Sequence, residues 1–226
     1  MEGEKRGAGT DAATKVFVVV VLLMTVALGF RYFFVQWGAR PEARKARCRS
    51  NLNQLARGMW VYLDNYGDCR FYPFPLGQGL EPDDFGGDEW LAALYWTGSV
   101  LPDPGCFICP DSGDTNHNGE DLGSYRAVRG RFGSQTVSYA ALHYKSLTDA
   151  EGNPKGGVIR DCDDDERLHE PMACDDTEGT INHGQATNGH MNILFFDGRV
   201  EVWPHTKIDL EHGVGMKGGP LWRLRN

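Results

Sequence analysis

Positive charge is scarce in the larger part of this chain. Residues 58–226 carry thirteen Lys and Arg against twenty-seven Asp and Glu, whereas residues 1–57 carry ten against four. Nucleic acids are polyanions that bind basic surfaces, so this imbalance excludes nucleic acid as a partner. An acidic region is compatible with calcium binding, because carboxylates are the ligands that this ion prefers.

The sequence also lacks the common catalytic motifs. It has no Gly-x-Ser-x-Gly elbow, no phosphate-cradling glycine-rich loop and no second Cys-x-x-Cys. His183, His190 and Asp197 form the one combination that could serve acid–base or metal chemistry. Turn geometry explains Asp197 better, and no nucleophile is tied to the histidines, so we expect these residues to be structural and the protein not to be an enzyme.

One long apolar run organises the chain. Residues 16–37 contain no charge before Arg31 and end in the aromatic segment 32–37. As a helix, this run spans about 30 Å, which matches the hydrocarbon core of a membrane. A cleaved signal peptide is the alternative, but aromatic residues, Arg31 and a basic stretch follow the run in place of a small-residue cleavage site. We therefore expect an uncleaved transmembrane helix.

Two signals conflict over the side of the membrane on which the rest of the chain lies. More Lys and Arg follow the run than precede it, which by the positive-inside rule places the following domain in the cytoplasm. Six cysteines behind an anchor favour an oxidising, extracytoplasmic compartment.

The pattern divides the chain into four segments. Residues 1–15 are expected to form a disordered tail and residues 16–37 the membrane helix. Residues 38–66 form a membrane-proximal amphipathic helix that begins after a break or kink at Gly38 and Pro41. Its apolar stripe is Leu52, Leu55, Met59, Tyr62, Leu63 and Tyr66. Residues 67–226 form a globular domain.

Within that domain the pattern predicts few regular elements and many loops. A short helix is expected from the N-cap Asp88 to Gly98, and a strand over residues 136–144. Two strands flank Asp197-Gly198, a pair that suits a two-residue type I′ turn. The fold class is therefore α+β, with a long N-terminal helix packed on a small antiparallel sheet.

A candidate calcium loop lies in residues 114–120. Asp114, Asn116 and Asn118 offer oxygen ligands at alternate positions, Gly119 permits a tight turn, and Glu120 follows. The twelfth position is Tyr125 where an EF-hand has a bidentate Glu, so only half of that pattern is present. A polar turn without an ion is the alternative.

The cysteines are candidates for disulfides. Cys162 and Cys174 flank an acidic loop and are the best pair, and Cys69 with Cys106 or Cys109 is the second. Cys48 and Cys69 stand too far apart on one helix to pair, so Cys48 is left free or pairs between chains. Cys106-x-x-Cys109 also has the spacing of half a zinc site.

Several of these segments together resemble type IV pilin-like proteins. The segments are Arg-Cys-Arg-Ser-Asn-Leu-Asn-Gln-Leu at 47–55, Tyr62–Asp68, Cys109-Pro110, Ser138-Tyr139 and Ala173–Asp175. The chain is similar above all to a pilin-like family abundant in planctomycete-type bacteria, whose members end in a His-Gly…Asn…Phe-x-Asp-Gly-x-Val signature. Here the signature residues are His183, Gly184, Asn192, Phe195, Asp197, Gly198 and Val200.

The resemblance implies a structural subunit of a filament or of a secretion-type assembly such as type II secretion. Its partners would be other pilin-like subunits, and the protein would be a single-pass protein of the inner membrane with an extracytoplasmic domain, or part of an extracellular filament. Major pseudopilins of type II secretion systems hold calcium in a loop of this domain. The chain departs from type IV prepilins because no Gly lies directly before the apolar helix and no Glu lies within residues 16–30. This departure favours the first alternative, a stand-alone anchored extracytoplasmic binding module, over filament assembly. An enzyme that uses the His183 and Asp197 region is the second alternative.

Overall fold

A computed structural model describes residues 8–67, 72–73, 86–98, 100–142, 168–176 and 178–225. The chain divides into two compact units, Met1–Ala43 and Arg44–Asn226. The helices and strands described are α1 (Ala8–Asn65), α2 (Gly87–Trp96), the 3-10 helices η2 (Pro104–Phe107) and η3 (His117–Gly119), α3 (Tyr125–Val128), β1 (Ala140–Leu142), β2 (Pro171–Cys174), β3 (His190–Phe195), β4 (Val200–Pro204) and β5 (Leu224–Arg225).

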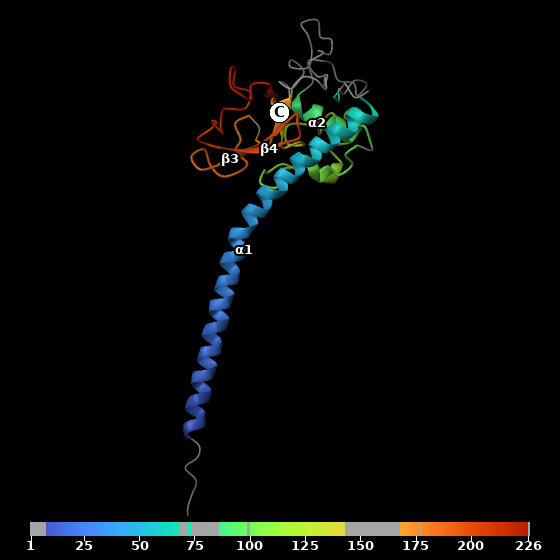
Figure 1. Ribbon diagram of the computed structural model, residues 1–226. Helices are drawn as coiled ribbons and strands as arrows, with labels where there is room; N and C mark the ends of the chain where they lie inside the picture. The colour runs from blue at the N-terminus through green and yellow to red at the C-terminus, as the bar shows by residue number, and fades with distance from the viewer. Residues whose placement is uncertain are drawn as a thin grey trace, which may run out of the picture. The chain divides into compact units, whose positions relative to one another are not determined.

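Helix α1 is continuous over 58 residues (Figure 1). It begins at Ala8, inside the segment that the sequence predicts to be a disordered tail, and it passes through Pro41 without ending. Of the two predicted possibilities at Gly38 and Pro41, a break or a kink, the break is therefore wrong. A proline removes one backbone hydrogen bond and crowds the preceding turn, and strong helix-forming sequence on both sides outweighs that local cost.

The last third of α1 supplies one wall of the core. Its buried stripe has the three-and-four spacing of an amphipathic helix and consists of Cys48, Leu52, Leu55, Met59 and Leu63. Tyr62 is partly buried, and Tyr66, which the pattern also assigns to the stripe, is 51% exposed. The helix ends where the backbone N–H groups of Tyr66 and Gly67 both donate to the carbonyl of Tyr62, at 2.8 and 2.9 Å.

The strands form one antiparallel sheet in the order β4-β3-β2-β1-β5. The predicted α+β class with a small antiparallel sheet is confirmed, and the expected strand at 136–144 is shorter, limited to Ala140–Leu142 in the residues described. All three residues of β1 are buried, because this strand lies inside the sheet between β2 and β5.

Helix α2 packs closely on β1 and β5. A Cβ atom added at Gly87 would lie 2.1 Å from the carbonyl oxygen of Arg225 and 2.5 Å from that of Ala141, so this contact requires glycine. The N-cap is Gly86, whose N–H donates to Glu89 Oε2 at 2.7 Å, and not Asp88 as predicted. Asp88 lies in the first turn, where the positive end of the helix dipole stabilises a negatively charged side chain.

The β3–β4 hairpin lies where the sequence predicts it, but its turn is different. Phe195 N–H donates to the carbonyl of Arg199 at 2.9 Å, which leaves a three-residue loop from Phe196 to Gly198. Gly198 has φ of +82° and Asp197 has no positive φ, so the two-residue type I′ turn is wrong. A turn followed by one left-handed glycine is the usual three-residue alternative.

Candidate functional site

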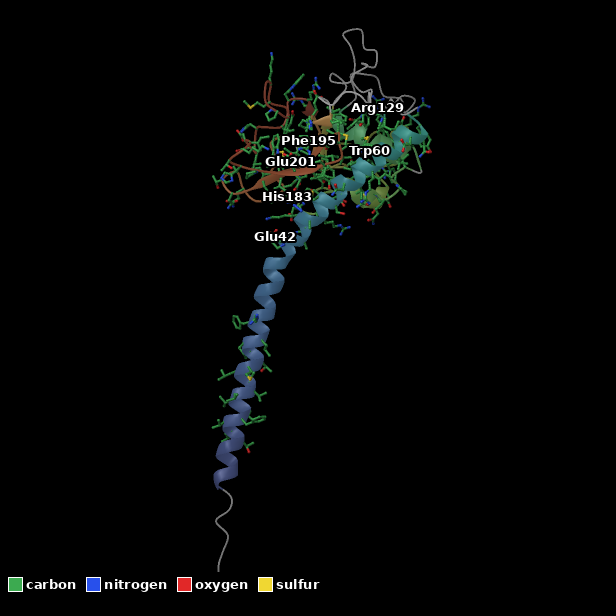
Figure 2. The ribbon with its side chains drawn as sticks, in the orientation of Figure 1. Glu42, Trp60, Arg129, His183, Phe195 and Glu201 are labelled. Atoms are coloured by element: carbon green, nitrogen blue, oxygen red, sulfur yellow. The ribbon has the colours of Figure 1, made fainter. Side chains whose placement is uncertain are left out.

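A cluster of buried polar side chains lies where the end of α1 packs on the rest of the globular unit, Arg44–Asn226. It contains Cys48 from α1, Cys109 from the segment after η2, Asp175 from the end of β2 and His183 from the loop before β3. The exposed fraction is 0% for the first three residues and 1% for His183. Figure 2 shows His183 within the globular unit. Four segments far apart in the sequence therefore supply one site.

Local structure aims Cys109 into this cluster. Asp103 caps η2 by accepting a hydrogen bond from Gly105 N–H at 2.9 Å, and Pro104 is the first helical residue, as is common at helix starts. The helix ends at Phe107, and Ile108 is extended. The side chains of Cys106 and Cys109 therefore have different neighbours. Cys106 Sγ lies 3.1 Å from Gln54 Oε1, which is not part of the cluster.

The imidazole of His183 is held by a carboxylate at each nitrogen. Nδ1 lies 2.8 Å from Asp111 Oδ2, and Nε2 lies 2.8 Å from Asp175 Oδ2. Arg44 Nε pairs with the other oxygen of Asp111 at 2.6 Å. Both ring nitrogens donate in this arrangement, so His183 is an imidazolium. Burial alone lowers the pKa of His183, but hydrogen bonds to Asp175 and Cys109 and their charges raise this pKa to about 11.

Asp175 is fixed by the neighbouring strand. Its Oδ1 accepts from the backbone N–H of Asn192 at 2.7 Å, and its Oδ2 accepts from the Asn192 side-chain amide. The ring of His190 stacks on that of His183 with centroids 5.2 Å apart and planes 11° apart. Contacts within the protein therefore hold both the Asp175 carboxylate and the His183 ring in fixed orientations.

The two thiols of the cluster are in direct contact. Cys48 Sγ lies 2.9 Å from Cys109 Sγ and 3.7 Å from Tyr139 Oη, while Cys109 Sγ lies 3.7 Å from His183 Nε2. The hydrogen bond from Cys48 lowers the pKa of Cys109, burial opposes this change, and the hydrogen bond to His183 lowers it further, to about 6. Burial, followed by the contact with Cys109, raises the pKa of Cys48 far above its usual range. Of the two thiols, Cys109 is therefore the more acidic and Cys48 is the hydrogen-bond donor.

Two kinds of chemistry are conceivable for this set of groups. One ligand atom each from Cys48, Cys109 and His183 lies within 4.8 Å of the others, which is compact enough for a metal ion. A Cys–His–Asp series also resembles the nucleophile, base and orienting acid of a hydrolase. Because these side chains are essentially inaccessible to solvent, a substrate cannot reach Cys109 in this conformation.

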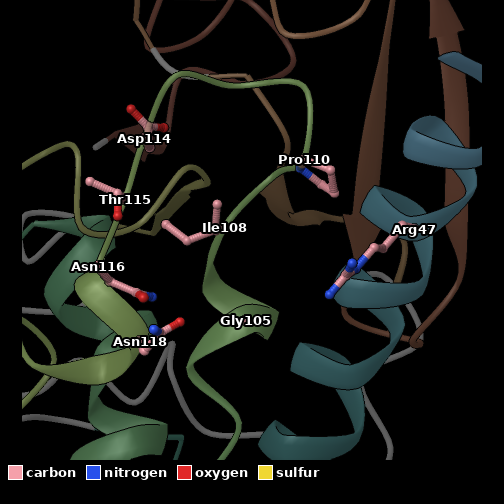
Figure 3. A pocket seen from close by; sticks show the side chains of 8 residues that line it. All are labelled: Arg47, Gly105, Ile108, Pro110, Asp114, Thr115, Asn116 and Asn118. Atoms are coloured by element: carbon pink, nitrogen blue, oxygen red, sulfur yellow. The ribbon is translucent and has the colours of Figure 1, made fainter. Parts of the chain in front are cut away.

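The predicted calcium ligands lie elsewhere, on a shallow pocket between the segment 105–118 and α1. Asp114, Asn116 and Asn118 line this pocket, and Figure 3 shows Arg47 facing them from α1. Asn116 is buried and its amide donates to the carbonyl of Pro104 at 2.8 Å. Glu120 is exposed and does not line the pocket. Calcium binding here stays a prediction, and the guanidinium of Arg47 opposes it.

Four of the cysteines have free thiols in the structure, namely Cys48, Cys106, Cys109 and Cys174, and all four are buried. Cys174 Sγ lies 3.3 Å from the carbonyl oxygen of Asp176. Cys69 and Cys162 lie outside the described residues, so the predicted pairs Cys162–Cys174 and Cys69 with Cys106 or Cys109 stay predictions.

The residues that carry the predicted signature divide between two places. His183 and Asn192 belong to the buried cluster, and Gly184 beside them has φ of +93°. Asp197 and Gly198 form the β3–β4 turn, where Asp197 Oδ1 accepts from Arg199 N–H at 2.9 Å. Asp197 is therefore a turn residue, as expected.

Sequence reasoning did not connect the members of the buried cluster. The only signals were motif fragments, Cys48-x-x-Asn51, Cys109-Pro110 and Ala173–Asp175, which it noted separately. Nothing in the spacing of these fragments indicates that their side chains meet.

Comparison of the chain with protein-family models, with curated proteins and with solved structures finds no match in any of the three.

Proposed function

We propose that this protein is a membrane-anchored, pilin-like structural subunit whose globular unit lies outside the cytoplasm. The observation that carries the proposal is the division of α1 into two chemically different parts. Thr14–Arg31 has a mean hydropathy of 2.0 and none of it is buried, whereas the stripe from Cys48 to Leu63 is buried in the core.

The exposed part of α1 needs an apolar environment. Its side chains include Phe17 and Phe30, which are 68% and 62% exposed, and Figure 2 shows the side chains of this segment extending freely from the helix. Burying such a surface in lipid is favourable by about 25 cal/mol per Å². A membrane anchor and a signal sequence both fit this length and composition. The continuous helix into the core supports the anchor, because cleavage after the apolar run would cut one helix in two.

The other part of α1 belongs to the globular unit. The helix that carries the apolar segment also supplies buried core residues of that unit. A neighbour that packs on the apolar segment therefore contacts an element that the globular unit shares. The resemblance of residues 47–55 and of the His183–Val200 signature to pilin-like proteins points to the same architecture, with other pilin-like subunits as partners.

Cysteine cross-linking in membranes tests whether the anchors pack specifically. Ala27 and Gly29 are small, and nothing lies within 4 Å of a Cβ added at Gly29. Two residues correspond to about 200° around a helix, so Ala27→Cys and Gly29→Cys place thiols on nearly opposite faces of one span. In a packed assembly one position cross-links much faster than the other under mild oxidation, and electron microscopy of the sheared membrane fraction shows filaments that contain the chain.

Equal, slow cross-linking at both positions and no filaments would contradict the assembly. That result means random collision of separate anchors, and it leaves the stand-alone binding module. An intact-mass measurement of the chain from membranes tests the anchor independently, since a mass that lacks residues 1–37 identifies a cleaved signal sequence.

A further inference from the structure

The contact between Cys48 and Cys109 is closer than their burial alone requires. Their sulfur atoms lie 2.9 Å apart although the residues are 61 positions apart in the chain. A disulfide bond is about 2.0 Å long, so the gap closes with a shift of less than about 1 Å. We propose that Cys48 and Cys109 form a disulfide in the mature protein, which links α1 covalently to the segment after η2.

The surroundings of Cys109 suit the formation of this bond. The thiolate, not the thiol, is the nucleophile in disulfide exchange, and a neighbouring cation stabilises it. His183 supplies that cation 3.7 Å from Cys109 Sγ. Asp111 and Asp175 hold both ring nitrogens, and this keeps the imidazolium protonated and in place. Cys106 lies against Gln54, and burial, followed by the charge of Asp103, raises the pKa of the Cys106 thiol to about 12.

The reaction needs an oxidant, and its class is a disulfide, either of a small molecule or of a thiol–disulfide exchange protein. The Cys109 thiolate attacks one sulfur of that disulfide, whose S–S bond breaks and releases one thiolate. Cys48 then gives its proton to the first released thiolate and attacks Cys109 Sγ in the mixed disulfide, which releases the second thiolate. Two electrons pass to the reagent, which leaves as one thiol and one thiolate, and the thiolate takes its proton from water. Since both cysteines are fully buried in the folded unit, the reagent has to reach Cys109 before α1 packs over it, with His183 already beside Cys109.

A metal ion is the competing occupant, and the hydrogen bonds of His183 disfavour it. A metal-binding histidine offers the lone pair of one ring nitrogen, but both nitrogens of His183 lie against carboxylates. The distance between the sulfur atoms does not separate the two occupants, because two thiolates on one zinc ion lie about 3.8 Å apart, as far from the observed 2.9 Å as a disulfide bond is. The Cys-x-x-Cys spacing does not help either, because Cys106 points away from Cys109.

This inference rests on the extracytoplasmic placement proposed above, since disulfides persist in oxidising compartments. The test starts from the full chain, extracted from membranes under denaturing conditions with a thiol-blocking reagent present and then digested without reduction. The expected result is a linked pair of peptides that contain Cys48 and Cys109, separated by reductant with a gain of one hydrogen on each sulfur. Cys106 is expected to be alkylated in the same sample.

Matched variants connect the bond to stability. Reductant lowers the melting temperature of the wild type and of Cys106→Ser by similar amounts, and it lowers that of the Cys48→Ala/Cys109→Ala double variant clearly less. If the double variant does not fold, the peptide map of the wild type alone shows whether Cys48 and Cys109 are linked.

Three results would overturn the proposal, and they differ in what else they affect. Alkylated Cys48 and Cys109 beside a Cys162–Cys174 bridge would end this inference and leave the oxidising compartment intact. Full alkylation of all cysteines would contradict the inference, and the topology measurement at the end of the Discussion would then decide whether the placement fails too. A stoichiometric metal ion in native mass spectra that is lost in Cys109→Ala would identify a metal site.

Discussion

Asn51 of α1 and Tyr139 of the segment before β1 meet at the core, with Asn51 Nδ2 3.2 Å from Tyr139 Oη. The same amide donates to the carbonyls of Gly105 and Ile108, at 3.1 and 2.9 Å. One side chain, 3% exposed, thus joins α1 to the η2 segment and to the start of the sheet. It also lies beside the Cys48–Cys109 contact, since Tyr139 Oη is 3.7 Å from Cys48 Sγ.

Removing the Asn51 amide is therefore expected to destabilise the globular unit. Asn51→Ala leaves the part-buried carbonyl groups of Gly105 and Ile108 without this donor, which costs about 1–3 kcal/mol of the free energy of unfolding. Denaturant unfolding measures this loss. Asn53→Ala is the matched control, because Asn53 lies on the same helix and is exposed, and its effect is expected within about 0.5 kcal/mol. Equal effects of the two variants would contradict the proposed role of Asn51.

His183 gives the unit a pH dependence with a definite sign. Its pKa in the folded chain with a free Cys109 is about 11, above the ordinary value of 6.5, and the hydrogen bond and charge of Asp175 raise this pKa also when Cys109 is in a disulfide. The folded state therefore binds the proton more tightly than the unfolded state, so this contribution to stability is complete below pH 6.5 and is lost as the pH rises through about 11. The melting temperature is expected to fall across this range.

Substitution of His183 separates this effect from other titrations. His183→Gln removes the cation between the half-buried Asp111 and the fully buried Asp175 and is expected to cost about 3–5 kcal/mol at neutral pH. The pH dependence between neutral and alkaline solution also becomes flatter. His205→Gln, at an exposed position, leaves both properties unchanged. A pH profile of His183→Gln parallel to that of the wild type would exclude His183 as the titrating group.

The packing of α2 on the sheet can be tested at Gly87. An added methyl group would meet backbone oxygen atoms of Arg225 and Ala141, which have no freedom to move aside, so Gly87→Ala is expected to cost about 3 kcal/mol. At Gly130 nothing lies within 4 Å of the added atom, and Gly130→Ala is expected to change stability by less than about 1 kcal/mol. Thermal unfolding of the two variants provides the comparison, and a Gly87→Ala chain as stable as Gly130→Ala would contradict the packing described.

Calcium binding at the 114–120 loop has its own test. If the ion binds there, Asp114→Ala lowers the melting temperature in calcium and leaves it unchanged in chelator, because only the bound state loses a ligand. Asp64→Ala removes an exposed carboxylate outside the loop and serves as the control. An equal fall in calcium and in chelator would remove the metal from the account, and the exposed Glu120 and the facing Arg47 would then describe an ordinary polar turn.

The sequence predicted those features whose cause is local. The stripe from Leu52 to Leu63 follows from helical spacing, and it is buried as expected. The hairpin around Asp197-Gly198 was found because alternating apolar residues flank a turn pair. The turn type was missed because Asp197 accepts the N–H of Arg199, and this arrangement needs a positive φ only at Gly198.

The buried cluster could not be predicted for the opposite reason. Cys48 and Cys109 meet only because α1 packs across the η2 segment, and Asp175 reaches His183 only through the pairing of β2 with β3. The spacing of residues along the chain does not predict such tertiary contacts. The sequence therefore suggested Cys162–Cys174 as the best pair, whereas the structure brings Cys48 and Cys109 together.

The side of the membrane on which the globular unit lies is the most direct test of the whole account. A protease is added to intact cells whose outer envelope has been opened, and the chain is followed with an epitope placed after Asn226 and with a cytoplasmic marker protein. The account predicts that the epitope is lost while the marker stays intact. An epitope that survives until the inner membrane is permeabilised would place the unit in the cytoplasm and contradict the proposed function.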